Sequence, residues 1–134
     1  MNIQVAVLCD AATDDHGKLN LLGAFDTIYA PQMPAVHPYC TVALRVTFAS
    51  NEEGQHKLTI NFINADGRSI MQPIEMPVAV TLPDDAHFLT RNFIVHFQNL
   101  TFAEAGLYSV DIRLDGKAQA GIPLFVKGLP PQPA

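Results

Sequence analysis

Apolar and polar residues alternate one by one along most of this 134-residue chain. A period of two places successive side chains on opposite faces of a β-strand. Stretches with the apolar spacing of an amphipathic helix are hard to find. The alternation predicts strands over residues 2–9, 18–29, 40–48, 57–62, 69–82, 88–98, 108–114 and 118–127. We therefore expect an all-β protein of about eight strands.

Turn signals separate these predicted strands. The pair Asp115-Gly116 lies between two alternating runs and predicts a two-residue hairpin, because both central positions of that turn require positive φ. Residues 65–68 carry a similar Asp-Gly signal, and the polar residues 10–17 predict a loop. Residues 30–38 contain prolines that remove backbone donors, so we expect no regular pairing there.

Four positions inside the strands predict local irregularities. Gly23 indicates a bulge or a close approach of another backbone within the second strand. Pro73 and Pro77 favour a sheet edge for residues 69–82, where missing donors cost little. Arg91 shares its parity with the apolar face of residues 88–98, so we expect the strand to begin after it and the charge to stay in water.

About eight strands with turn signals between them, in a domain spanning residues 1–127, indicate an all-β, two-sheet antiparallel β-sandwich of the immunoglobulin-like kind. One corner carries that interpretation furthest. Gly106 and Tyr108, after Leu100 and Phe102, resemble the corner at which a glycine permits the bend and a tyrosine hydroxyl bonds back to the preceding chain. Residues 128–134 are rich in proline and are predicted to form a disordered tail.

Several longer segments resemble a known family. They are LLGAFDTIYAPQMPAVHPYC, HKLTINFINADGR, PDDAHFLTRNF, YSVDIRLDG and IPLFV. These segments are similar to those of a family of small uncharacterised bacterial proteins, over residues 1 to about 127. The resemblance implies a β-sandwich and brings with it no catalytic residue, cofactor or substrate.

Composition narrows the classes of partner. The net charge is −5 with eight Lys and Arg, and no basic cluster could hold a phosphate backbone, so we expect no nucleic-acid partner. The apolar stretch at the N-terminus is too short for a signal peptide or a membrane span, which favours a cytoplasmic protein without a membrane partner. Cys9 and Cys40 are then expected to be reduced, strand-buried thiols.

Strong catalytic and metal-binding motifs are missing from the sequence. The one nucleophilic arrangement that can be drawn is Cys9 or Cys40 with His37, and both cysteines lie on apolar-facing positions. The histidines at 16, 37, 56, 87 and 96 lack the short paired spacing of zinc sites. We therefore expect no enzyme, no catalytic residue, no cofactor and no metal site.

Two acidic segments, residues 10–16 and 84–87, leave an alternative open. If they lie at the same end of the sandwich, their carboxylates can converge on a hard cation such as Ca²⁺. Aspartate is also common in turns simply because it bonds to nearby backbone. The residues concerned are Asp10, Asp14, Asp15 and His16 in one segment and Asp84, Asp85 and His87 in the other.

The segment APQMPAVHP, residues 30–38, favours a binding surface. Prolines stiffen it, and Met33 and Val36 lie within it while Tyr29 and Tyr39 flank it. A preorganised apolar loop loses little entropy on binding, so we expect partner contacts here. A loop folded over the end of the core is the alternative.

Together these observations favour a non-enzymatic protein-interaction or structural module, which binds another protein, or itself as a homo-oligomer, through loops or an edge strand. The alternative is a small-ligand or calcium-binding β-sandwich that uses its Asp-rich loops. An enzyme with an unfamiliar site ranks third, because fold does not determine function.

Overall fold

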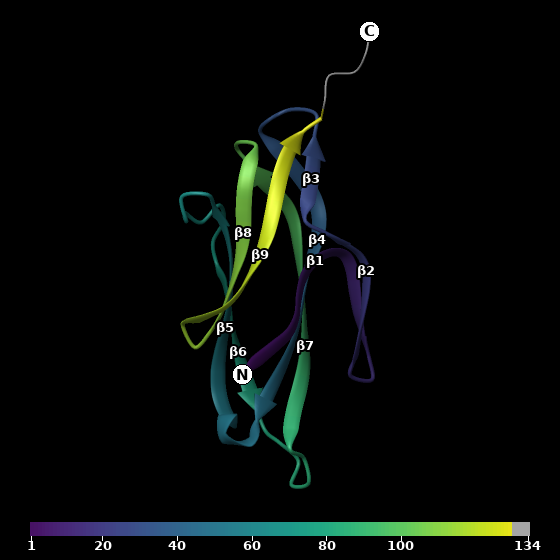
Figure 1. The fold of residues 1–134 in the computed structure, drawn as a ribbon, viewed down its shortest axis with the longest axis vertical. Coiled ribbons are helices and arrows are strands. Elements are labelled where there is room, and N and C mark those ends of the chain that lie inside the picture. The colour runs from purple at the N-terminus through teal and green to yellow at the C-terminus, as the bar shows by residue number, and fades with distance from the viewer. Residues whose placement is uncertain (130–134) are drawn as a thin grey trace.

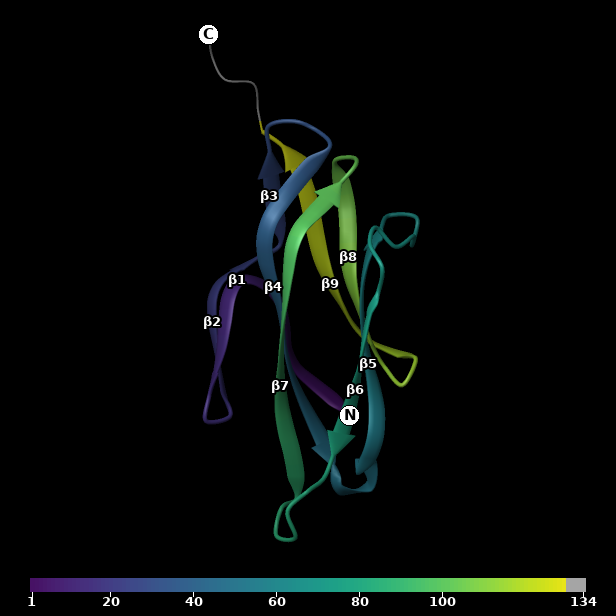
Figure 2. The same cartoon turned by 180° about the vertical axis from the view of Figure 1, so that it is seen from behind.

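The computed structural model describes residues 1–129, which form two β-sheets packed face to face (Figures 1 and 2). The strands are β1 (Asn2–Asp15), β2 (Lys18–Phe25), β3 (Thr27–Ala30), β4 (Ala35–Ala49), β5 (Gly54–Asn64), β6 (Ile74–Val80), β7 (Phe88–Phe102), β8 (Gly106–Leu114) and β9 (Lys117–Gly128). The first sheet has the order β2-β1-β4-β7 and the second β3-β9-β8-β5-β6. A 3₁₀ turn at Ser50–Glu52 joins β4 to β5.

The all-β prediction is confirmed, with nine strands where about eight were expected. All pairs are antiparallel except β3 with β9, which is parallel. This exception arises because the predicted strand over residues 18–29 splits at Asp26. The Asp26 carbonyl accepts a hydrogen bond from the Phe125 N–H (2.8 Å), so the chain passes there from the first sheet to the second.

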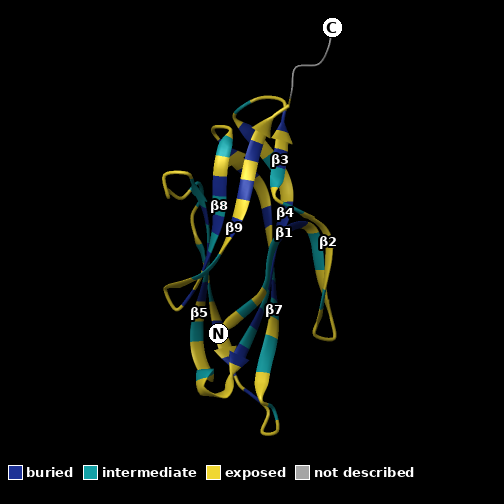
Figure 3. Cartoon of the chain, viewed as in Figure 1, coloured by how far each residue is buried: buried dark blue, intermediate teal, exposed yellow. Residues whose placement is uncertain are grey.

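One apolar core fills the space between the sheets. In β8 the alternation works as predicted, and Tyr108, Val110, Ile112 and Leu114 are all buried (Figure 3). Phe62 of β5 meets Phe97 of β7 edge to face, with ring centroids 4.8 Å apart, and so joins the two sheets. Each large apolar side chain buried in this way contributes about 1.5–3 kcal/mol.

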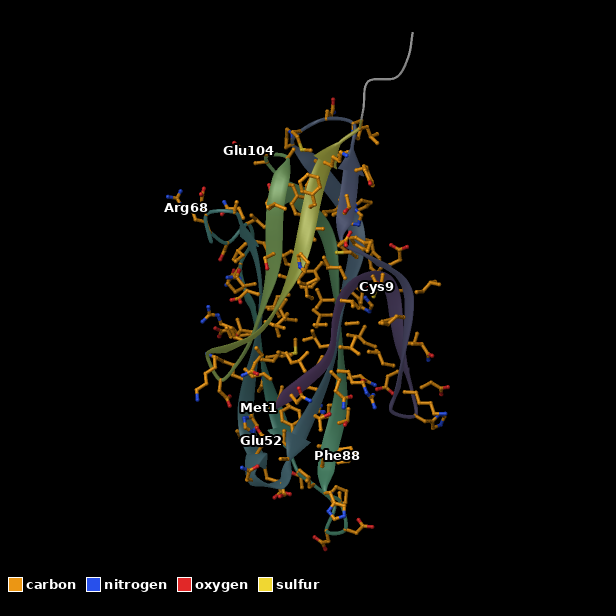
Figure 4. The ribbon with its side chains drawn as sticks, in the orientation of Figure 1. Met1, Cys9, Glu52, Arg68, Phe88 and Glu104 are labelled. Atoms are coloured by element: carbon orange, nitrogen blue, oxygen red, sulfur yellow. The ribbon has the colours of Figure 1, made fainter. Side chains whose placement is uncertain are left out.

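The turns at the two ends of β8 contain residues with positive φ. The Tyr108 hydroxyl donates to the carbonyl of Glu104 (2.6 Å), and Gly106 has φ 142° (Figure 4). Asp115 and Gly116 have φ 54° and 78°, which confirms the two-residue hairpin between β8 and β9. Glycine and aspartate are suited to these positions because they tolerate positive φ.

The predicted loop over residues 10–17 is wrong. Strand β1 continues to Asp15, and only His16 and Gly17 form the turn to β2. Polar residues are compatible with a strand here because β1 pairs with β4 only as far as Cys9 and then pairs with β2 alone. Residues 10–25 thus form a hairpin arm that leaves the sandwich (Figures 1 and 2).

Two further boundaries differ from the prediction. Strand β4 begins at Ala35 despite Pro38, because the ladder between β4 and β7 skips Pro38 opposite Asn99, whose φ is 54°. Strand β7 includes Arg91, whose Nη1 donates to the Ala79 carbonyl (3.0 Å) while its guanidinium lies over the Phe93 ring. The arginine remains exposed, so the strand accommodates it without burying the charge.

The ends of the second sheet follow the prediction in part. Strand β6 lies at the edge with Pro77, as expected. The predicted Asp-Gly turn forms, because the Gly67 N–H donates to the Asn64 carbonyl (2.9 Å) and Ser69 pairs antiparallel with Ile63, but the chain then leaves the ladder and β6 begins only at Ile74. The predicted disordered tail is wrong for its first two residues, because Gly128 belongs to β9 and the Leu129 N–H donates to the Ala30 carbonyl (2.9 Å). Residues 130–134 lie outside the described part of the chain.

Candidate interaction edge

Strand β3 is the shortest strand and forms one edge of the second sheet. Ile28 and Ala30 point into the core and are buried, whereas Tyr29 is 60% exposed. Before the strand, the Thr27 hydroxyl donates to the Asp26 carboxylate (2.9 Å). The alternation of Thr27–Ala30 therefore fixes one face of β3 against the core and leaves its outer face in contact with solvent.

The backbone of β3 has a paired edge and an unpaired edge. The carbonyls of Asp26 and Ala30 accept hydrogen bonds from the N–H groups of Phe125 and Leu129. Successive residues of a strand direct their backbone polar groups to opposite edges. The N–H and C=O groups of Thr27 and Tyr29 consequently point away from β9, toward the side of β3 that has no strand partner.

A groove of about 460 Å³ lies beside this edge. Its lining consists of residues 23–25 and 27–29 together with Asp10 and His37. Volumes of about 300–1,000 Å³ are typical of binding pockets. The opposite wall begins at β4, whose residues Ala35–Tyr39 pair with β7 on one side but not with β1, since β1 joins β4 only from Thr41 onward. This part of β4 has no strand partner on its β1 side, so the groove lies between β4 and β3.

His37 of β4 lines the groove. Its ring lies 5.7 Å from the ring of Phe25, and its Nε2 is buried without a hydrogen-bond partner in the structure. A buried polar nitrogen without a partner is costly, and in native proteins it usually has an explanation. In the sequence His37 was considered as a partner for Cys9 or Cys40 and as one of five scattered histidines, and the spacing of residues gave no signal for its place beside β3.

An apolar patch on the outer face of the second sheet adjoins β3. Leu107 of β8 is 64% exposed and stands opposite Phe125 of β9, which in turn stands opposite Thr27. Tyr29 and Leu129 extend the same patch, and both are at least half exposed. Exposed apolar patches of this kind often mark interaction sites.

The proline-rich segment divides between the two roles that the sequence left open. Met33 packs against the core, which is the behaviour of a loop folded over the end of the sandwich. Val36 is 57% exposed, and Tyr29 lies at the groove. Tyr39 instead faces out from the first sheet, where its hydroxyl bonds to His96 Nδ1 (2.6 Å). The predicted surface is thus only partly realised and is centred on β3.

The thiol arrangement considered in the sequence has the wrong environment for a nucleophile. Cys9 and Cys40 are at most 1% exposed, and neither forms a disulfide within residues 1–129. Burial raises the pKa of Cys40 to about 11 and also raises the pKa of Cys9. Both groups are neutral thiols at physiological pH, and the reactive species of cysteine is the thiolate.

The acidic segments are not brought together. Residues 14–16 lie at the tip of the arm and residues 84–87 in the turn between β6 and β7, which are separate in both views (Figures 1 and 2). Asp14 is engaged locally: Asn92 and the Gly17 N–H donate to its carboxylate and lower its pKa. Within the described residues no group of three or more His, Cys, Asp or Glu could hold a metal ion.

A second hollow, of about 550 Å³, lies between residues 64–66 and the corner at residues 103–108. It is larger than the groove beside β3, but its titratable lining consists of Asp66, Glu104 and Tyr108, and the Tyr108 hydroxyl is engaged with the Glu104 carbonyl. We therefore base the functional argument on β3, where the groove adjoins unpaired backbone groups.

Over residues 1–129 the structure contains no helix with the length and apolar character needed to span a membrane.

Comparison with known proteins gives one match. No curated protein and no solved structure matches the chain. A family model described as a family of unknown function, DUF6941, matches residues 4–127, which include nearly all of the two sheets. The chain therefore belongs to the DUF6941 family, a family of unknown function.

Proposed function

We propose that this protein is a non-enzymatic interaction module that binds an extended segment of a partner protein along the unpaired edge of β3. The observation that carries the proposal is the direction of the Thr27 and Tyr29 backbone groups, which point to the side of β3 where the groove lies. Addition of a strand to an exposed sheet edge is a common mode of peptide recognition, in which main-chain hydrogen bonds provide affinity.

The surroundings of β3 suggest how specificity arises. Side chains of an added strand alternate between two faces. One set would lie on the outer face beside Tyr29 and the exposed Leu107 and Phe125. The other set would enter the groove toward Phe25 and His37, where an acceptor on the partner can bond to the unpaired Nε2.

Our proposal includes no catalytic step. It is supported by the high pKa of the buried thiols and by the engagement of His56, whose two ring nitrogens bond to Asp115 and to the Glu52 carbonyl.

The reduced thiols are also compatible with a cytoplasmic location, because cytosolic cysteines are kept reduced. We further propose a relationship to immunoglobulin-like sandwiches, supported by the hydrogen bond from Tyr108 to Glu104 at the Gly106 corner.

Peptides selected from a random display library on the immobilised protein provide the test. Their affinity is measured by fluorescence anisotropy for the wild type, Tyr29→Pro and Tyr29→Ser. Proline removes the outward N–H and is tolerated on edge strands, whereas serine removes only the aromatic ring. We expect Tyr29→Pro to weaken binding at least about tenfold, that is by about 1.4 kcal/mol, and Tyr29→Ser to weaken it less.

Thermal unfolding of each variant serves as the control for folding. Binding that is equally strong in the wild type and in folded Tyr29→Pro would refute the proposal, as would selection of peptides that leave the amide exchange of Thr27 and Tyr29 unchanged. A library that yields no binder to the wild type would also count against it.

A further inference from the structure

A second edge, in the hairpin arm, has different properties from β3. Strand β2 pairs with β1 on one side and ends the first sheet on the other. It has eight residues and none of them is buried, with Leu21 40% and Leu22 70% exposed (Figure 3). A long exposed apolar edge of this kind is a template for pairing with another chain.

The arm holds β2 in a fixed position. At its tip the Gly17 carbonyl accepts hydrogen bonds from Arg45 Nη1 (2.8 Å) and from Asn92 Nδ2 (3.2 Å), and Asn92 Nδ2 also donates to Asp14 (2.9 Å). Arg45 and Asn92 are opposite each other on β4 and β7. The arm therefore folds back over the outer face of the first sheet, and Thr41 and Ala43 on that face are fully buried.

The hairpin turn determines which backbone groups of β2 are unpaired. His16 and Gly17 have φ 53° and 84°, and in a two-residue hairpin the flanking pair, Asp15 and Lys18, exchanges hydrogen bonds. The groups of Asn20 and Leu22 then also point to β1. Those of Leu19 and Leu21 point to the unpaired edge.

The edge strands β6 and β7 carry features that discourage pairing with another chain. Strand β6 contains Pro77, and β7 is interrupted by the positive φ of Asn99. Strand β2 keeps one unshifted register with β1 from Lys18 to Phe25, although Gly23 has φ 69°. This stretch is thus the most regular unpaired edge of the first sheet.

We propose that β2 pairs antiparallel with β2 of a second copy of the chain, about a twofold axis at Leu22. Twofold symmetry places the outward groups of Leu19 and Leu21 opposite Phe25 and Gly23 of the second copy. Gly23 has no side chain to oppose Leu21. The same register brings Lys18 opposite Asp26 of the second copy, twice by symmetry.

Charge complementarity selects this register over its neighbours. An axis at Asn20 would place Lys18 opposite Leu22 of the second copy and leave both charges without a partner across the interface. Lys18 and Asp26 are exposed, and neither forms a salt bridge within residues 1–129. Opposite charges facing each other across a strand pair stabilise it.

Sedimentation velocity over protein concentrations up to the order of 100 µM tests the pairing, because a pair of short strands buries less area than a standard interface. We expect the wild type to dimerise. Leu21→Pro, which removes an outward N–H, should weaken the dimer at least about tenfold, equivalent to about 1.4 kcal/mol. If Leu21→Pro fails to fold, Leu22→Lys provides the same test by placing two like charges on the axis.

Charge exchange tests the register. Lys18→Asp and Asp26→Lys should each weaken the dimer, and the double variant should restore it, while Lys117→Asp at the other hairpin should leave it unchanged. A wild type that stays monomeric, or a double variant no better than the singles, would overturn the proposal. Leu21→Pro should retain peptide binding at β3 and Tyr29→Pro should retain the dimer, so failure at one edge is distinguishable from failure at the other.

Discussion

The β1–β2 and β8–β9 hairpins close with the same kind of turn and yet have opposite environments. Both turns have two residues with positive φ, His16-Gly17 and Asp115-Gly116. Every inward side chain of β8 from Tyr108 to Leu114 is buried, whereas β2 contains no buried residue. Turn chemistry therefore specifies that a hairpin forms, and a second apolar surface determines whether it becomes part of the core.

The apolar positions explain this difference. In β8 the apolar residues from Tyr108 to Leu114 all fall on one face, so they can all contact the opposite sheet. In β2, Leu21 and Leu22 are consecutive and point to opposite faces. One of the two side chains must therefore point into solvent, and Leu22, which is 70% exposed, does so.

The largest difference should appear on truncation of an apolar side chain in each hairpin. Ile112→Ala in β8 leaves a cavity and should lower the free energy of unfolding by about 2–5 kcal/mol. Leu22→Ala in β2 should change it by less than about 0.5 kcal/mol, because the side chain is exposed. Urea denaturation at low protein concentration measures both. Similar losses for the two variants would show that β2 is part of the core.

Substitution of the glycines sharpens the comparison. Gly116→Ala places a side chain at φ 78° in open space and should cost about 1–2 kcal/mol. Gly23→Ala has a similar φ of 69°, and its Cβ would also lie 2.5 Å from Asp10 Oδ2. We expect Gly23→Ala to cost more, and Asp10→Ala to remove the excess. If the additional loss of stability persists in the double variant, its cause is the backbone conformation at Gly23 and not the contact with Asp10.

The turn of each hairpin also has an aspartate bonded to a histidine: Asp15 bonds to His16 within the turn, whereas Asp115 bonds to His56 of β5. His56 bonds through Nδ1 to Asp115 (2.6 Å) and through Nε2 to the Glu52 carbonyl (2.5 Å), and both nitrogens donate when the ring is protonated. The bond to Asp115, followed by the bond to Glu52, raises the pKa of His56. His16 is exposed at the tip of the arm.

Because the folded pKa of His56 exceeds its unfolded pKa, the stability it contributes is full below about pH 6.5 and is lost as the pH rises through the raised value. We expect the thermal midpoint to fall between about pH 6 and about pH 9, by less than the effect of Ile112→Ala. His56→Gln should reduce this slope. An unchanged slope in His56→Gln would contradict the assignment.

A further small effect on stability concerns the contact of the arm with the first sheet. Asn92→Ala removes two hydrogen bonds to the tip and should cost about 1 kcal/mol or less, because this region is exposed. Cys9 lies where β1 bends into the arm (Figure 4), so its labelling by a thiol reagent should accelerate in the variant. Labelling of Cys40 is the internal control, and equal acceleration of both would indicate global unfolding.

The sequence predicted well those parts of the fold that depend on local pattern. The alternation of β8, the Asp115-Gly116 turn and the edge position of β6 with Pro77 all follow from properties of single strands and turns. The arm was missed because residues 10–15 are polar, and their pairing with β2 depends on the turn at His16-Gly17, which lacks the usual Asn-Gly or Asp-Gly signal.

The candidate site was predicted less well than the fold. Tyr29 and Val36 were expected at a binding surface and are exposed, but Met33 joined the core. Nothing in the spacing of residues placed His37 beside Phe25 or opened the groove at β3, because that groove exists only where β1 leaves β4 and the chain changes sheets at Asp26. Such a site depends on tertiary topology, which local patterns do not encode.

Residue-resolved amide hydrogen exchange at low protein concentration tests the central claim, that β3 has an unpaired edge, most directly. The account predicts alternation along β3: the amides of Thr27 and Tyr29 exchange rapidly, and those of Ile28 and Ala30, which face β9, are protected. Equal protection of all four amides would mean that the edge is already occupied, and it would contradict both the free edge and the proposed mode of binding.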